Sequence, residues 1–219
     1  MYYIINPLIE FIAAVIAVFF LSNKRVGWFA IFPVFLMLVV FFEIMGNVIF
    51  FYWHQTNNYW WYNAYLPIQF SFISWVIYKI CKPYFNSKPF VLLGLATFIS
   101  FYLFESIQSH FVGYSNTTKT IFSIWVILMC FIFYYKFLQK EENLSLSSHP
   151  EFWIMTGIFF FYFVSTAANL FFEYLASYNK NQIRPVRYTI FLILNIILYG
   201  SFSYAFICKH KQTILQPTS

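Results

Sequence analysis

Four glutamates in this sequence stand inside long apolar segments, where an ionised side chain is costly. They are Glu10, Glu43, Glu105 and Glu173, among seven acidic residues in a chain without Asp. Carboxylates within membrane-spanning helices commonly mark ligand sites or ion pathways. These four residues therefore predict an acidic site that binds a small molecule or a cation.

The depths of these carboxylates along their segments are similar. Glu43 lies 17 residues beyond Val26, where its segment begins, and the helical rise converts this to about 25 Å. Glu105 and Glu173 lie similarly far along their own segments, and Glu10 enters from the opposite end of the first one. We therefore expect all four carboxylates to occupy one layer near the outer face of a membrane.

Polar residues accompany the carboxylates at helical spacing. Asn6, Asn47, Ser109 and Asn169 each stand four residues from one of the glutamates, a separation that puts both side chains on one helix face. Because lipid offers no partner to an amide, these faces are expected to converge. The predicted ligand-binding residues are Glu10, Glu43, Asn47, Gln69, Glu105, Asn169, Glu173 and Asn195.

Other interpretations of the same residues stay open. The glutamates could instead hold helices together through contacts with Arg and Asn, with their carboxylates reaching toward the headgroups. A weak divalent-metal hypothesis uses His54, His110 and Glu105, although their spacing matches no known ligand pattern. The segment around Trp60 and Trp61 is typical of an interfacial aromatic belt, or of a wall beside a cationic ligand.

Several chemistries lack the residues that they require. The last apolar segment, Val186–Cys208, contains no Lys, so a retinal Schiff base is excluded and no cofactor is predicted. A nucleophilic triad lacks an Asp and a suitably placed Ser–His pair. We therefore predict that the protein is not an enzyme.

The composition places the chain in a bilayer. Of 219 residues, 61% are hydrophobic and 9% are charged, whereas a soluble domain has roughly 25% charged residues. The net charge of +6 does not indicate nucleic-acid binding, because the basic residues are scattered over short connecting segments. The lipid bilayer is thus the predicted surrounding of most side chains.

Seven segments are long and apolar enough to cross about 30 Å of hydrocarbon as helices. The sequence thus predicts an all-α membrane protein, a single transmembrane domain over residues 1–219 that forms a seven-transmembrane-helix bundle. The expected spans are about 3–21, 26–51, 62–80, 89–109, 119–138, 151–177 and 186–208.

The basic residues predict an orientation. Nine Lys and Arg residues fall at one set of segment ends and four at the other, and the richer side of a membrane protein is normally cytoplasmic. The N-terminus is then outside and the C-terminus cytoplasmic. The expected location is the cytoplasmic (inner) membrane.

Three stretches of the sequence carry a resemblance to a family. They are TNNYWWYNAYLPIQF, HPEFWIMTGIFFFYFVSTAANLFF and LNIILYGSFSYAFIC. They resemble uncharacterised small seven-transmembrane bacterial membrane proteins, often encoded beside sensor histidine kinases. The family pattern has an acidic residue where this chain has Gln69. The resemblance implies a membrane setting and a histidine kinase or another membrane protein as partner.

The leading functional hypothesis is a receptor-like sensory protein. It would bind an unidentified small ligand or cation in an outward-facing acidic pocket and signal through its partner. One alternative is a transporter of a small cation or amine, which would need polar residues through the inner half of the membrane. Another alternative is a structural subunit of a membrane complex.

Overall fold

The computed structural model describes most of the chain. The described residues are 2–22, 24–51, 58–109, 113, 115–140, 146–176 and 180–215. Within them, the side chains of residues 2–4, 24–25, 147, 172–176 and 180–185 lie outside the description.

The described residues form helices and no strands, which confirms the all-α prediction. Six segments are long and apolar enough to cross a membrane, and the apolar stretch Ile5–Leu21 is shorter. The protein is therefore an integral membrane protein. The described residues contain seven α-helices, which are α1 (Tyr2–Leu21), α2 (Phe32–Phe51), α3 (Tyr59–Cys81), α4 (Lys88–Gln108), α5 (Asn116–Lys140), α6 (Pro150–Ala176) and α7 (Lys180–Leu215).

Helix boundaries differ from the predicted spans mainly at α7. The sequence predicts residues 186–208, whereas the helix runs from Lys180 to Leu215. Its additional turns are polar, and an apolar window of membrane thickness does not include them. The helix continues through them because backbone hydrogen bonding does not stop where hydrophobicity ends.

The predicted span over 26–51 contains a break. A 3₁₀ segment, η1 (Lys24–Ile31), precedes α2, and Gly27 inside it has a φ of 64°. An L-residue with a side chain rarely adopts this conformation, whereas Gly does so readily. The chain changes direction there before the regular helix begins.

The chain divides into two compact units, each described separately here. Unit 1 comprises residues 1–37 and 144–219, and unit 2 comprises residues 38–143. Unit 1 thus contains α1, η1, the start of α2, η2 (Leu146–Ser148), α6 and α7. Unit 2 contains the rest of α2 with α3, α4 and α5.

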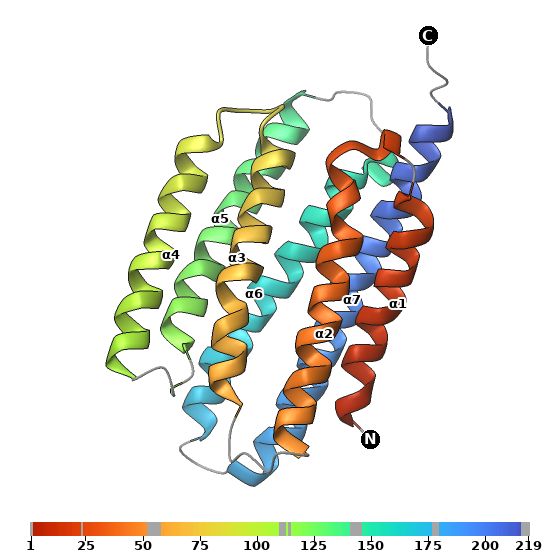
Figure 1. Ribbon diagram of the computed structural model, residues 1–219. Helices are drawn as coiled ribbons and strands as arrows, with labels where there is room; N and C mark the ends of the chain where they lie inside the picture. Colours follow the sequence, from red (N-terminus) through yellow and green to blue (C-terminus); the bar gives the residue numbers. More distant parts are fainter. Residues whose placement is uncertain are drawn as a thin grey trace. The chain divides into compact units, whose positions relative to one another are not determined.

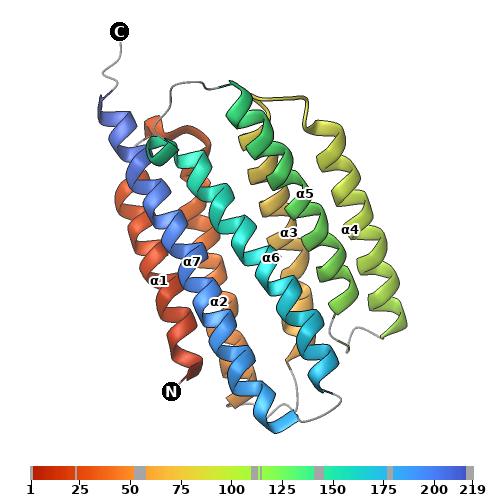
Figure 2. The same ribbon diagram turned by 180° about the vertical axis from the view of Figure 1, so that it is seen from behind.

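Helix α7 is the central element of unit 1, because it packs against both α1 and α6 (Figure 2). On α1, the small residues Ala13, Ala14 and Ala17 are at most 1% exposed. On α6, a Cβ added to Gly157 would lie 2.9 Å from the Cβ of Ser201 on α7. Small side chains therefore let the helices approach closely, as is common in membranes.

In unit 2, α3, α4 and α5 lie side by side (Figure 1), and aromatic side chains fill the core between them. The ring of Phe70 stacks on that of Phe122 at 4.0 Å, and Phe98 meets Phe70 edge-on at 4.6 Å. Trp125 lies against Gly94 and donates its indole N–H to the Phe90 carbonyl at 3.2 Å. These contacts join the α4–α5 pair to α3.

Two glycines provide a matched test of the α6–α7 packing. We expect Gly157→Ala to lower the free energy of unfolding by about 1–3 kcal/mol relative to Gly200→Ala, because overpacking strains a close contact. No heavy atom lies within 4 Å of the position that a Cβ would take at Gly200. Gly200→Ala should therefore cause no steric strain and should stabilise the helix, because Ala has a higher helix propensity than Gly. Denaturant titration of both variants in one detergent measures the difference. Equal stabilities would contradict the packing described.

Candidate functional site

The most deeply buried carboxylate of the described chain is that of Glu10 in unit 1. The residue is 2% exposed, and the Tyr199 hydroxyl on α7 donates to its Oε1 at 3.4 Å. Tyr199 is itself buried at 8% exposure. A carboxylate and a phenol from two helices far apart in the sequence thus meet in the interior of unit 1.

Helices α1 and α7 run parallel in a constant register. Glu10 meets Tyr199 with a separation of 189 residues, and His210 meets the Phe20 carbonyl with a separation of 190. Because the difference between the numbers of facing residues stays nearly constant over about three helical turns, the two helices run in the same direction. Asn6 and Asn195 are also 189 residues apart, so this register places them at one level, one turn from the Glu10–Tyr199 pair.

Helices α6 and α7 run antiparallel, and their register brings in Tyr162. In an antiparallel pair, the numbers of facing residues have a nearly constant sum. The close pairs Gly157–Ser201 and Trp153–Tyr204 have sums of 358 and 357. The numbers of Tyr162 and Asn195 also add to 357. Tyr162, which is 4% exposed, therefore belongs to the level of Asn195.

We call Asn6, Glu10, Tyr162, Asn195 and Tyr199 the polar layer of unit 1. It receives side chains from three helices, with α7 between the other two. The Asn6 Oδ1 atom is buried and has no hydrogen-bond partner among the described residues. The same holds for Thr166 Oγ1, one turn beyond Tyr162 on α6. Buried polar atoms without a partner are costly and call for an explanation such as a bound group.

The remaining predicted residues of unit 1 lie farther along α6. Arg187 on α7 donates to the Asn169 side-chain oxygen at 3.0 Å, so Asn169 ties the two helices together. Glu173 belongs to the last turn of α6, but its side chain lies outside the described part. The predicted convergence of Glu173 on the other carboxylates therefore stays a prediction.

In unit 2, Glu43 takes part in the contact between α2 and α3. The Tyr62 hydroxyl donates to Glu43 Oε2 at 3.2 Å, and the ring of Tyr62 fills the space that a side chain at Gly46 would need. Asn58 donates to the Gly46 carbonyl at 3.0 Å, and Trp61 donates to the Phe42 carbonyl at 2.9 Å. The first turn of α3 is thus fixed on one turn of α2.

Glu105 caps the N-terminus of α5. Its Oε1 accepts the Thr117 N–H at 3.1 Å, and its Oε2 accepts the N–H and the hydroxyl of Thr118 at 2.9 and 2.6 Å. The first amides of a helix lack intrahelical acceptors, and the positive end of the helix favours a negative charge. The carboxylate therefore joins the end of α4 to the start of α5.

Asn63 closes the same end of unit 2. It is 4% exposed, donates to the Gly113 carbonyl at 2.6 Å and accepts the Ser115 N–H at 3.4 Å. The Tyr102 hydroxyl donates to the backbone carbonyl of Asn63 at 3.1 Å. Asn63 thus ties the start of α3 to Tyr102 on α4 and to the residues just before α5. Glu43 and Glu105 are separately bonded to protein donors.

The predicted residues therefore fall into two groups. Glu10 and Asn195 belong to the polar layer of unit 1, whereas Glu43 and Glu105 take part in interhelical contacts of unit 2. Asn47 lies one turn beyond Glu43 on α2, and Gln69 lies half-buried on α3 two turns from Tyr62. Whether residues of the two units share one pocket stays a prediction.

Metal binding has no support in the described side chains. No group of three or more His, Cys, Asp or Glu residues that could hold a metal occurs among them. His54 and His110, two of the three residues in the metal hypothesis, lie outside the described residues. Glu105, the third, bonds to Thr117 and Thr118.

Sequence reasoning missed Tyr162 and Asn63. Tyr162 precedes Asn169 by seven residues on α6, so extending the stripe of Asn169 and Glu173 by two helical turns would have identified it. Asn63 stands among aromatic residues, and nothing in the sequence indicates that its amide reaches a loop 50 residues away.

No family model matches the sequence, and no curated protein or solved structure matches it.

The capping role of Glu105 can be tested against another acidic residue near a helix start. We expect Glu105→Gln to lower the free energy of unfolding by about 1–3 kcal/mol, because charge-assisted hydrogen bonds to α5 are lost. Glu151→Gln, in the first turn of α6, changes the same charge and should cost less than about 1 kcal/mol. Denaturant titration measures both, and an equal cost would argue against the cap.

Proposed function

We propose that the protein is a receptor-like sensory membrane protein whose ligand site is the polar layer of unit 1. The observation that carries this proposal is the buried Glu10–Tyr199 pair beside the orphaned Asn6 acceptor. Buried polar atoms of a membrane helix are retained at a cost, and such residues commonly serve binding.

The chemistry of the layer favours a small cationic ligand. Its members supply a carboxylate from Glu10, phenol rings from Tyr162 and Tyr199, and amides from Asn6 and Asn195. A carboxylate attracts a cation, aromatic faces add a cation–π attraction, and amide oxygens accept hydrogen bonds from an ammonium group. A neutral molecule would use the amides and phenols without the charge.

Helix α7 is suited to carry a response away from this layer. It supplies Asn195 and Tyr199, packs on α1 and α6, and continues for sixteen residues beyond Tyr199 to Leu215. At that end it bonds to α1 through His210 and to η2 through Gln212. A ligand that changes the packing of α7 would therefore also displace its far end.

The proposed partner is a membrane protein such as a sensor histidine kinase, in line with the family resemblance. The connections between the helices are short, so a signal would pass through helix displacement to that partner. The proposal places the N-terminus outside and the C-terminus in the cytoplasm of a bacterial cell, across its inner membrane. The basic residues at the end of α7 agree with this orientation.

Ligand-induced thermal stabilisation tests the site. The purified protein is heated with a panel of Na⁺, K⁺, primary amines and quaternary ammonium ions. We expect at least one of them to raise the Tm of the wild type, because binding to the folded state stabilises it. Glu10→Gln and Tyr199→Phe should each lower the ligand affinity about ten-fold or more, which corresponds to roughly 1.4 kcal/mol. The ligand-induced rise in Tm should therefore be smaller in both variants.

Glu105→Gln is the matched control, because it neutralises a carboxylate that is engaged in a helix cap. It should retain the ligand-induced shift measured from its own baseline Tm. A panel in which nothing stabilises the wild type, or in which Glu10→Gln responds as the wild type does, would contradict the proposed site.

A further inference from the structure

The last turns of α7 meet η1 in a contact that positions a lysine. Lys209 Nζ lies 5.3 Å from the ring centroid of Phe29, which is fully buried in η1. Trp28 packs on the same ring at 4.2 Å. The attraction between an ammonium and an aromatic face holds the Lys209 side chain toward η1.

Hydrogen bonds on two sides fix this end of α7. His210 Nδ1 lies 3.1 Å from the carbonyl oxygen of Phe20 on α1. Gln212 Nε2 donates to the Ser148 carbonyl in η2 at 3.0 Å. The backbone that carries Lys209 is therefore held relative to α1 and η2, and the ammonium has a defined place beside η1.

The composition of η1 is that of a segment at a membrane surface. It begins with Lys24 and Arg25 and contains the half-buried Trp28. Tryptophan and basic residues concentrate where hydrocarbon meets headgroups. Glu151, in the first turn of α6, is the acidic residue of unit 1 at this end within the described chain. Basic residues thus outnumber acidic ones at the end of unit 1 that contains η1 and the last turns of α7.

We propose that η1 and the Lys209 turn of α7 bind the phosphate of an anionic phospholipid headgroup. An ammonium held beside aromatic rings at the interface lies at the depth of lipid phosphates, and each basic residue near an anionic surface contributes about 1 kcal/mol. The acyl chains of the lipid would extend along the apolar helices. This site is independent of the polar layer and of the ligand proposed for it.

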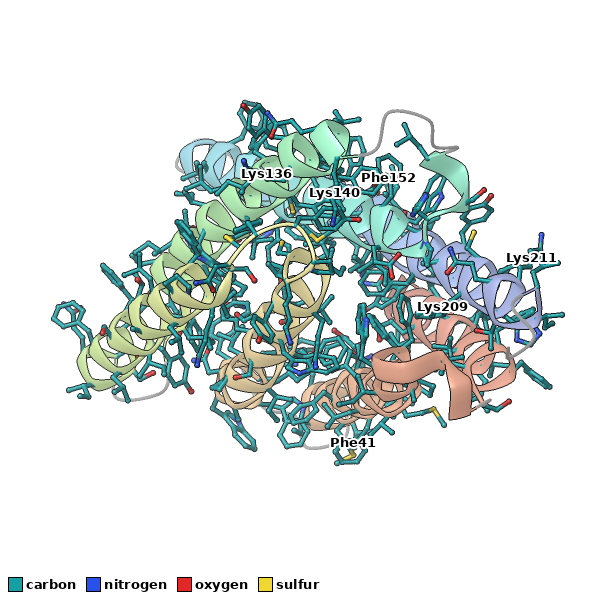
Figure 3. All side chains as sticks on the ribbon, turned by 90° about the horizontal axis from the view of Figure 1, so that it is seen from above. Phe41, Lys136, Lys140, Phe152, Lys209 and Lys211 are labelled. Carbon is teal, nitrogen blue, oxygen red and sulfur yellow. The ribbon has the colours of Figure 1, made fainter. Side chains whose placement is uncertain are left out.

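Lys211 offers a matched control on the same helix. It is exposed and lies two residues from Lys209, so its side chain leaves α7 about 200° around the helix axis. Both lysines are labelled at the end of α7 in Figure 3. Their substitution by Gln removes the same charge at nearly the same membrane depth.

Native mass spectrometry of the full chain, released from bilayers of phosphatidylglycerol and phosphatidylcholine in equal amounts, measures the lipid that is retained. Lys209→Gln should lower the affinity for phosphatidylglycerol about five-fold, the equivalent of roughly 1 kcal/mol. Lys211→Gln should keep most of the binding, and Lys209→Arg should restore it. Equal losses in the two Gln variants would mean diffuse attraction and would overturn the site.

Two further measurements keep the proposal testable if Lys209→Gln does not fold. A photoactivatable phosphatidylglycerol should label the wild type in η1 and the last turns of α7, and labelling confined to other helices would overturn the site. Inorganic phosphate should fail to displace the lipid at millimolar concentration. Displacement would identify free phosphate as the occupant and overturn the lipid assignment.

Discussion

A bilayer offers no water to the polar groups of the helices that cross it, and this constraint explains how the polar side chains of the chain are arranged. Within each unit, several carboxylate, amide and phenol side chains bond to another helix, whereas Ser and Thr hydroxyls often bond to a carbonyl of their own helix. In unit 1 the result is the parallel register of α1 and α7, held by Glu10 with Tyr199 and by Phe20 with His210. Every inference about the polar layer depends on that register.

The intramembrane carboxylates have different surroundings. Glu105 bonds to Thr117 and Thr118 at the start of α5, where a negative charge is stabilised by helix amides. Glu10 instead accepts a hydrogen bond from the Tyr199 phenol on α7, and the helix registers place Asn6, Asn195 and Tyr162 at the level one turn away. The cap on α5 is a structural role that accounts for the Glu105 carboxylate without a ligand. The surroundings of Glu10 leave an orphaned amide oxygen, that of Asn6, which the fold does not explain.

The all-helical character was predictable because apolar length and breakers determine helices in a membrane. The largest boundary differences arise where polar turns extend α7 and where Gly27 interrupts the chain. The site was predictable in part. Helical spacing linked Asn6 to Glu10 along α1, and Asn195 on α7 was among the predicted residues. Spacing within a helix cannot reveal which helices are neighbours, so neither the pairing of Glu10 with Tyr199 nor the capping role of Glu105 could be read from the sequence.

Cysteine cross-linking in membranes tests the polar layer most directly. The register of α1 on α7 places residue 6 opposite residue 195, so the double variant Asn6→Cys/Asn195→Cys should form a disulfide efficiently on mild oxidation. Asn6→Cys/Ser203→Cys, with its partner about 12 Å farther along α7, should not. Efficient cross-linking of the second pair, or of neither, would contradict the convergence on which the proposed ligand site rests.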